Sequence, residues 1–208
     1  MRLTVFGATG GIGTEVVKQA LARDHDVTAV VRDPARLAVP SAAGLTVITA
    51  DVMDSAAIKP ALDGADAAAS ALGPRRGGPP NILTDSMRAI LAAMDATGTK
   101  RLATVSASGF FVEEGEGFLT GKIAKPLLRR ILRNNVNDTR HMEQLITTSP
   151  TDWTIMRPAQ LTNAEHGPYK TAMDHYVGAR IARADVADAI LNALTDEKTL
   201  THRVNLGY

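Results

Sequence analysis

Three glycines spaced three residues apart, Gly7, Gly10 and Gly13, stand near the start of the chain. Glycine lets a backbone turn tightly and approach a ligand closely, because it carries no Cβ atom. An apolar run at 2–6 precedes them, and apolar residues at helical spacing follow from Val16. A strand, a glycine turn and a helix in this order predict a dinucleotide site, since free N–H groups at the helix start face the pyrophosphate. The residues expected at the phosphates are Gly7, Thr9, Gly10, Gly11, Ile12 and Gly13.

Thr9 stands where the strict G-x-G-x-x-G fingerprint has its second glycine, so the chain carries G-x-x-G-x-x-G instead. Its hydroxyl could donate to a phosphate or cap the following helix. A glycine pattern alone is weak evidence, and a purely structural turn is the alternative. Its place between a strand and a helix favours the dinucleotide site.

The residues after the second expected strand, 26–31, should distinguish NADP(H) from NAD(H). In NAD sites an acidic residue about 20 positions beyond the glycines bonds the ribose 2′-hydroxyl. Arg32 takes that place here, nineteen residues after Gly13, and an arginine fork suits a 2′-phosphate. Arg36 follows one turn later and would assist, so the sequence predicts NADP(H). Two alternatives remain open: Asp33 could still reach a ribose, and both arginines could belong to a solvated loop.

The third expected strand, 45–49, ends in short side chains that should lie near the adenine. Asp51 and Val52 are the candidates, because the carboxyl ends of parallel strands face the ligand crevice. The neighbouring Asp54 is expected to cap the helix at 55–62 instead.

The fourth and fifth expected strands, 65–71 and 101–105, lead toward the nicotinamide end of the crevice. The residues expected beneath the nicotinamide ribose are Ala71, Leu72 and Gly73. Ser106 follows the fifth strand and could hydrogen-bond a substrate carbonyl or the nicotinamide, with Ser108 as the second candidate. Capping of the strand end is the alternative role for these serines.

The region after the fifth strand is the least regular. Phe110 and Phe111 could wall an apolar pocket. The stretch 117–134 interleaves apolar and basic residues, a pattern of a lid over the site or of a membrane-surface or partner-binding helix. Given the near-neutral net charge we expect a lid. His141 and Glu143 lie two positions apart on the next helix, so they form no metal pair and are expected at the surface.

The sixth expected strand, 153–156, should exit next to the nicotinamide. Pro158 is expected to stiffen a turn there, and Gln160 could offer its amide to a substrate. The stretch from about 158 to 182 is expected to form a small extension on the substrate side, with short strands near 167–171 and 178–181. Asp185 is expected to cap the closing helix.

Six expected strands alternating with helices predict an α/β fold: a Rossmann-type, doubly wound parallel sheet with helices on both faces. The 208 residues suit a single domain, 1–208.

A net charge of +1 gives no electrostatic reason to expect nucleic acid or membrane as a partner. The absence of cysteine and of long apolar runs predicts a cytoplasmic protein without thiol chemistry or a cysteine metal site, and no metal is expected.

The motifs resemble those of a known family. They are the glycine turn at 7–13, Val31-Arg32-Asp33 with Arg36, Asp51-Val52, Leu72-Gly73, the Ser106 exit, Asp152 to Pro158 and Gly167-Pro168-Tyr169, in that order. Over nearly its whole length the chain resembles the atypical short-chain dehydrogenases with an NAD(P)H-binding domain (NmrA-like). Within them it is most similar to the biliverdin reductase B and flavin reductase group.

The resemblance implies hydride transfer from NADPH to a planar, electron-poor molecule such as a flavin, a quinone or a linear tetrapyrrole. It places the nucleotide-binding residues on Thr9, Gly10, Ile12, Arg32 and Arg36 and the active-site serine on Ser106. The chain has Gln160 where the mammalian enzymes carry a histidine.

The chain lacks the Tyr-x-x-x-Lys pair that lowers a tyrosine pKa for alcohol oxidation, since Met173 and Arg180 stand four positions after Tyr169 and Tyr176. Ordinary alcohol dehydrogenation, isomerisation or epimerisation is therefore disfavoured. Reduction of a flavin or quinone needs less from the protein, because protons can come from water. The sequence thus predicts an NADPH-dependent reductase, a monomer or homodimer. The alternative is an inactive regulator that senses NADP(H).

Overall fold

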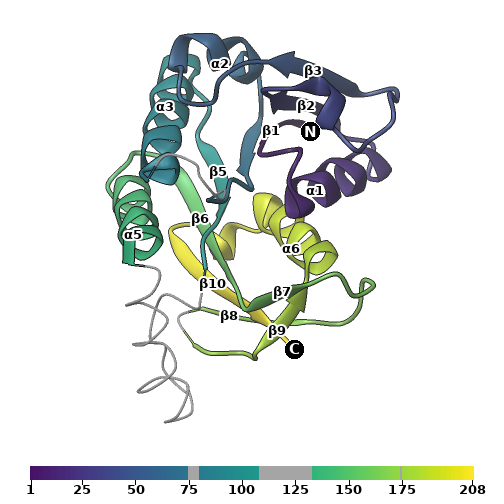
Figure 1. The fold of residues 1–208 in the computed structure, drawn as a ribbon, viewed down its shortest axis with the longest axis vertical. Helices are drawn as coiled ribbons and strands as arrows, with labels where there is room; N and C mark the ends of the chain where they lie inside the picture. Colours follow the sequence, from purple (N-terminus) through teal and green to yellow (C-terminus); the bar gives the residue numbers. More distant parts are fainter. Residues whose placement is uncertain (75–79, 108–132, 174) are drawn as a thin grey trace.

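A computed structural model of the chain describes residues 1–74, 80–107, 133–173 and 175–208 (Figure 1). The strands of the main sheet are β1 (Arg2–Phe6), β2 (Asp26–Val31), β3 (Leu45–Thr49), β4 (Ala67–Ser70), β5 (Arg101–Val105), β6 (Asp152–Pro158), β8 (Lys170–Met173) and β10 (His202–Gly207). The strands β7 (Gln160–Thr162) and β9 (Arg180–Ala182) pair separately. The helices are α1 (Gly11–Ala22), α2 (Ser55–Leu62), α3 (Ile82–Thr97), α5 (Arg133–Thr147) and α6 (Arg183–Thr195), with 3₁₀ turns η1 (Pro34–Arg36) and η4 (Glu197–Thr199).

The main sheet has the order β3-β2-β1-β4-β5-β6-β10-β8 and is parallel except for β8, which runs antiparallel to β10. The chain builds outward from β1 to β3, crosses back, and builds outward again from β4. This doubly wound arrangement confirms the predicted fold class. The reversal between β1 and β4 opens a crevice at their carboxyl ends, the place where such sheets bind ligands.

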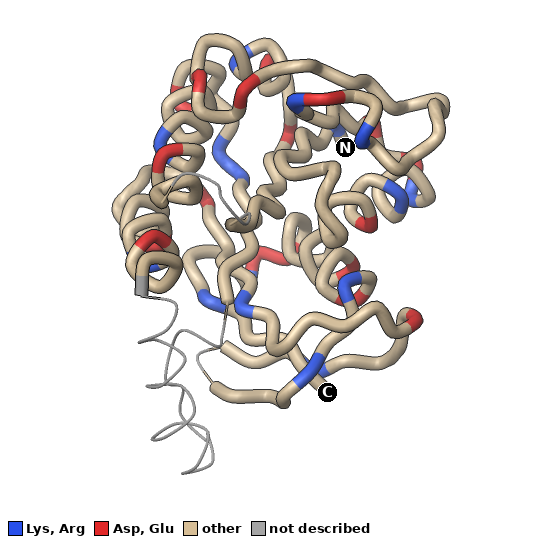
Figure 2. Tube along the Cα trace, viewed as in Figure 1, with Lys and Arg blue, Asp and Glu red and all other residues tan. Residues whose placement is uncertain are grey.

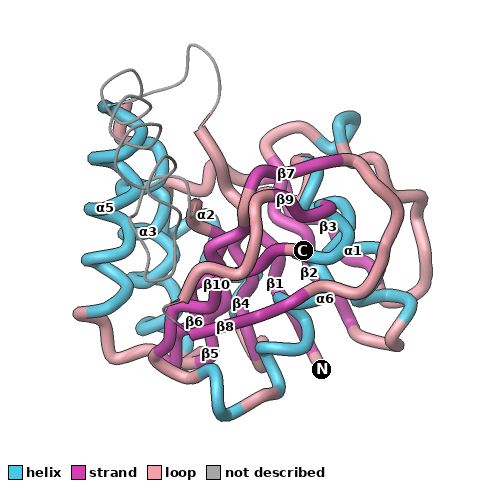
Figure 3. The backbone as a smooth tube through the Cα atoms, turned by 90° about the horizontal axis from the view of Figure 1, so that it is seen from below, coloured by secondary structure: helices cyan, strands magenta, loops and turns pink. Residues whose placement is uncertain are grey.

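Two apolar clusters cover the two faces of the sheet. One packs α1 and α6 against it, with Val16 and Ile190 fully buried. The other packs α2, α3 and α5 against the opposite face, with Ile58 and Ile146 fully buried. Figure 3 shows α3 and α5 on one side of the strands and α1 and α6 on the other. Interior strands are rich in buried apolar residues because helices cover both of their faces.

The strand β6 continues through Arg157 and Pro158, so the prediction that Pro158 forms a turn next to the nicotinamide was wrong. Pro158 is buried and stands opposite Leu206 of β10. Along β6, the Met156 carbonyl accepts from the Ser106 N–H on the β5 side, whereas the Ala159 N–H donates to Leu206 on the β10 side. The nitrogen of Pro158 therefore faces the side where β5 has already ended, and no ladder bond is lost there.

The sequence predicted that Asp185 caps α6, and this prediction was wrong. The helix begins at Arg183 with Ala182 as its N-cap, and Asp185 lies fully buried in the first turn. Its carboxylate bonds the His166 ring at 2.6 Å, accepts from the Gly167 N–H at 3.0 Å and accepts from the Tyr208 hydroxyl. Asp185 thus fastens the segment before β8 to the start of α6.

Positive and negative side chains are interspersed over most elements of the described chain, as Figure 2 shows. None of the helices described is long and apolar enough to cross a membrane. Ser108, Phe110, Phe111 and most of the basic stretch 117–134 lie outside the described residues. The helix that carries His141 and Glu143, α5, already includes Arg133.

Candidate functional site

The glycine turn joins β1 to α1 and touches the exit of β4. Gly7 has a φ of +80°, and a Cβ there would lie 2.8 Å from the backbone carbon and oxygen of Ala71. A Cβ on Gly13 would overlap the carbonyl oxygen of Gly7. Both positions therefore require glycine for close approach of backbone to backbone. The N-cap of α1 is Gly10, not Thr9, so the capping role considered for Thr9 is wrong.

A continuous groove runs across the carboxyl ends of the central strands. Its first part, the β1–β2 pocket, is lined by Gly7, Thr9, Val30, Val31, Arg32, Ala50, Val52, Leu72, Gly73 and Ile82. Its second part, the β4–β5 pocket of about 400 Å³, is lined by Gly7, Gly10, Gly11, Ile12, Ala71, Leu72, Gly73, Pro74, Val105, Ser106, Leu161 and Arg183. The two parts share Gly7, Leu72 and Gly73.

The fold brings most of the predicted site residues to this groove. Those that line it are Gly7, Thr9, Gly10, Gly11, Ile12, Arg32, Val52, Ala71, Leu72, Gly73 and Ser106. The predicted residues that do not line it are Gly13, Arg36, Asp51, Pro158 and Gln160. Among these, Asp51 is exposed and accepts from the Met53 N–H at 3.1 Å. Gln160 is exposed on β7, and its neighbour Leu161 faces the groove instead.

The residues after β2 take different positions, which bears on the alternative that Asp33 rather than Arg32 reaches the nucleotide. Arg32 lines the β1–β2 pocket. Asp33 instead caps η1, its carboxylate accepting from the Ala35 N–H at 3.1 Å. Asp54 caps α2 as predicted, accepting from Ala56 and Ala57 at 3.0 and 3.1 Å. The cation, and not the acid, therefore faces the groove at this strand end.

Ser106 donates its hydroxyl hydrogen to Glu143 of α5, with 2.5 Å between Oγ and Oε1. Glu143 is only 4 % exposed and holds Arg157 at both oxygens, Nε to Oε1 at 3.1 Å and an Nη to Oε2 at 2.6 Å. Arg203 of β10 adds its Nε at 3.2 Å from Oε2 and lies 5.7 Å from the centre of the Trp153 ring. We call these four residues, Ser106, Glu143, Arg157 and Arg203, the Glu143 cluster.

The prediction that Glu143 lies at the surface was wrong. The sequence carried a signal, because Val136, Thr139, Glu143 and Ile146 recur at helical spacing, and all four are buried. A carboxylate in such a buried row indicates that basic or polar groups from other parts of the chain contact it. His141, on the other side of α5, is exposed.

The Glu143 cluster fixes what Ser106 can offer to the groove. A carboxylate only accepts hydrogen bonds, so the single hydroxyl hydrogen of Ser106 is held by Glu143. Toward the β4–β5 pocket the serine presents lone pairs, which accept.

Among the described residues, no tyrosine lines either part of the groove. Burial, and then the hydrogen bond that Tyr169 donates to Asp188 at 2.6 Å, raise the pKa of the Tyr169 hydroxyl. The pKa of Tyr208 is also raised, chiefly by its hydrogen bond to Asp185. In the described ranges no three His, Asp or Glu side chains come together as metal ligands would.

Fold and groove together define a Rossmann-type dinucleotide-binding protein: the glycine turn, the apolar pocket after β2 and the strand exits lie where such a nucleotide binds. A family described as NAD(P)H-binding matches residues 7–197, and the chain belongs to this family. The predicted nicotinamide dinucleotide is thereby confirmed. The groove fits that group, because Gly7, Gly10 and Gly11 line it with bare backbone, which a pyrophosphate can approach closely.

Known proteins resemble the chain over nearly its full length. The protein YwnB of Bacillus subtilis is 28% identical over 206 residues, covering 93% of this chain and 92% of YwnB. A short-chain dehydrogenase/reductase of Veillonella parvula, solved in complex with NADP, has a TM-score of 0.83 at 21% identity and covers 100% and 94% of the two chains. A Rossmann-fold NAD(P)-binding family protein of Shigella flexneri has a TM-score of 0.79 at 24% identity, covering 99% and 92%. The solved structures share the fold, and the narrower grouping with flavin and biliverdin reductases stays a prediction.

Proposed function

We propose that the protein is an NADPH-dependent reductase that delivers hydride to a planar, electron-poor acceptor, such as a flavin, a quinone or a linear tetrapyrrole. NADPH supplies the hydride when bound. The observation that carries the proposal is the hydrogen bond from Ser106 to Glu143, because it decides which side-chain proton is available beside the β4–β5 pocket.

Both carboxylate oxygens of Glu143 accept hydrogen bonds from guanidinium groups, those of Arg157 and Arg203. The hydroxyl hydrogen of Ser106 is directed at the same carboxylate, so the serine cannot protonate a substrate without losing this bond. Reduction of a ketone needs such a proton at the developing alkoxide. A ring acceptor is already electrophilic and can take its proton from water, so it suits a site built in this way.

Ser106 in this proposal is an acceptor that orients a ring. Its lone pairs would hold an N–H group, either of the nicotinamide carboxamide or of a flavin or tetrapyrrole acceptor. Its role is thus positioning rather than proton donation, and positioning alone contributes substantially to hydride transfer. Gln160, the other predicted catalytic residue, is assigned no role in the proposal, because it does not line the pocket.

The proposed preference for NADPH over NADH rests on the two residues that follow β2, Arg32 and Asp33. Arg32 faces the pocket and Asp33 is occupied by η1, an arrangement that favours a 2′-phosphate over a free ribose hydroxyl. The Veillonella parvula structure contains NADP, which agrees with this preference.

The test is the loss of NADPH absorbance with FMN, riboflavin, menadione and biliverdin as acceptors, repeated with NADH. We expect turnover with at least one acceptor and a preference for NADPH. Ser106→Ala should slow turnover severalfold. Ser149→Ala should not, because Ser149 precedes the amino end of β6, away from the carboxyl ends that form the groove. Tight NADPH binding by calorimetry without turnover of any acceptor would instead support the regulator that senses NADP(H).

A further inference from the structure

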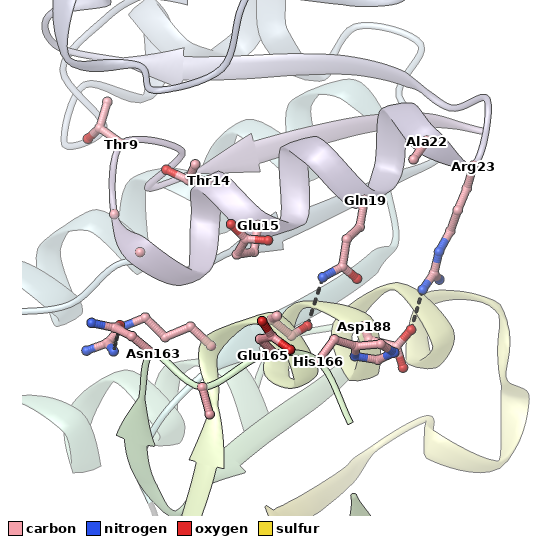
Figure 4. A pocket seen from close by; sticks show the side chains of 15 residues that line it. Thr9, Thr14, Glu15, Gln19, Ala22, Arg23, Asn163, Glu165, His166 and Asp188 are labelled. Carbon is pink, nitrogen blue, oxygen red and sulfur yellow. Dashed lines mark hydrogen bonds and ion pairs between the residues drawn. The ribbon is translucent and has the colours of Figure 1, made fainter. Parts of the chain in front are cut away.

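A second hollow, the α1–α6 cleft, adjoins the groove. Its volume is about 800 Å³, and it lies between α1, α6 and the segment 163–166. Figure 4 shows Glu15 and Gln19 of α1 on one side of the cleft, with Arg23, the residue after α1, directed at Asp188 of α6. Gly10, Gly11 and Arg183 line both this cleft and the β4–β5 pocket. The side chain of Arg183 therefore stands at the boundary between the two spaces.

Arg183 lies across the first turn of α1. A Cβ on Gly11 would be 2.6 Å from Cδ and 2.9 Å from Nε of Arg183, closer than these atoms can approach. Gly11 is thus the residue type that lets the arginine lie against the helix backbone. This contact holds a guanidinium group beside the glycine turn, at the wall of the groove.

One Nη group of Arg183 donates to the amide oxygen of Asn163 at 2.5 Å. Glu15 and Glu165 line the same cleft, but among the described residues no carboxylate forms an ion pair with Arg183. Arg23, which lines the same cleft, differs in this respect, because it forms an ion pair with Asp188 at 2.5 Å. Arg183 is also the first residue of α6, where a cation is disfavoured by the helix dipole. Helix stability therefore does not account for this arginine.

We propose that Arg183 binds the pyrophosphate of the nicotinamide dinucleotide, on the opposite side of it from β1. An arginine has five N–H donors, and Asn163 occupies one, which leaves enough for a bidentate bond to phosphate oxygens. The hydrogen bond to Asn163 orients the guanidinium group, and the absence of a Cβ on Gly11 leaves space for the Arg183 side chain. The negative charge of the pyrophosphate supplies the ion-pair partner that Arg183 lacks among the described residues. The proposal rests on NAD(P)H binding and not on the identity of the acceptor.

Calorimetry with the full chain tests the proposal, using ligands that carry different phosphates. ADP-ribose has the pyrophosphate without a 2′-phosphate, and adenosine 2′-monophosphate has the 2′-phosphate alone. Arg183→Gln should weaken ADP-ribose, NADH and NADPH by the same factor, roughly tenfold to hundredfold, as expected for charge-assisted hydrogen bonds. It should leave adenosine 2′-monophosphate unchanged.

Arg23→Gln is the matched control, since it removes a guanidinium group from the same cleft and should leave every affinity unchanged. Arg183→Lys keeps the charge but not the fork and should recover part of the affinity; circular dichroism checks that each variant is folded. Unchanged ADP-ribose binding in Arg183→Gln would overturn the proposal, as would equal weakening of adenosine 2′-monophosphate. Failure of the reductase assay would not affect it, because no acceptor enters these measurements.

Discussion

The two parts of the groove are built by different means. The β1–β2 pocket is shaped by backbone and apolar side chains: Gly7 against Ala71, the exit of β2 and the wall at Val52. The β4–β5 pocket borders the Glu143 cluster, whose charged side chains come from α5, β6 and β10. One part depends on local conformation, and the other on partners brought together by the whole fold.

This difference has energetic consequences. A pocket made by backbone approach tolerates changes that leave the turn intact, and fails when an added atom pushes the strands apart. A buried charge cluster stabilises little as a whole, because desolvation offsets attraction, but loss of one member leaves the others unpaired at high cost. Substitutions in the two regions should therefore differ in size and in what they affect.

Removal of the central carboxylate should have the largest effect. Glu143→Ala leaves two guanidinium groups and the Ser106 hydroxyl without their shared acceptor, and we expect a loss of about 3–5 kcal/mol in the free energy of unfolding. Urea denaturation measures this loss. The matched control is Asp85→Ala, which removes an exposed ion pair with Arg88 and should cost at most about 1 kcal/mol. Equal losses in the two variants would show that burial of Glu143 has no energetic consequence.

Arg32→Ala should change affinity rather than stability. Loss of the guanidinium group facing the β1–β2 pocket should cost about 1.5–3 kcal/mol of NADPH binding, a factor of roughly ten to a hundred, with little change for NADH. Titration calorimetry with both cofactors measures the ratio. Asp33→Ala should leave that ratio unaltered, since Asp33 caps η1. Equal losses of NADPH and NADH in Arg32→Ala would contradict the assignment of the 2′-phosphate site.

Gly13→Ala tests the backbone contact directly. The new Cβ would overlap the Gly7 carbonyl oxygen, so the turn must shift, at a cost of about 1–3 kcal/mol and with weaker binding of both cofactors. Thermal unfolding and calorimetry follow the two effects. Gly167→Ala, where no atom lies within 4 Å of the added Cβ, should stay within about 0.5 kcal/mol of the parent. A stable, fully binding Gly13→Ala variant would show that the close approach is not required.

Sequence reasoning predicted the doubly wound sheet, the glycine turn and Arg32, because each is specified by neighbours a few residues away. It could not place Glu143 and Arg203, since their pairing depends on the register between distant strands. It did not single out Arg183, whose proposed role depends on the packing of α6 against the first turn of α1, although a cation at the first position of a helix was a visible signal. The prediction for Pro158 was wrong because β6 pairs as far as Pro158 with β10, a strand from the end of the chain.

The Glu143 cluster joins residues from 106 to 203, and so it bears on the order in which the protein folds. The unit β1-α1-β2 can close from contacts within the first 31 residues, whereas the cluster waits for β10 to enter the sheet. Distant pairings are slow to form, because the loop between them must first be closed. We therefore expect the glycine turn to take shape early during folding and the reaction pocket to be completed last.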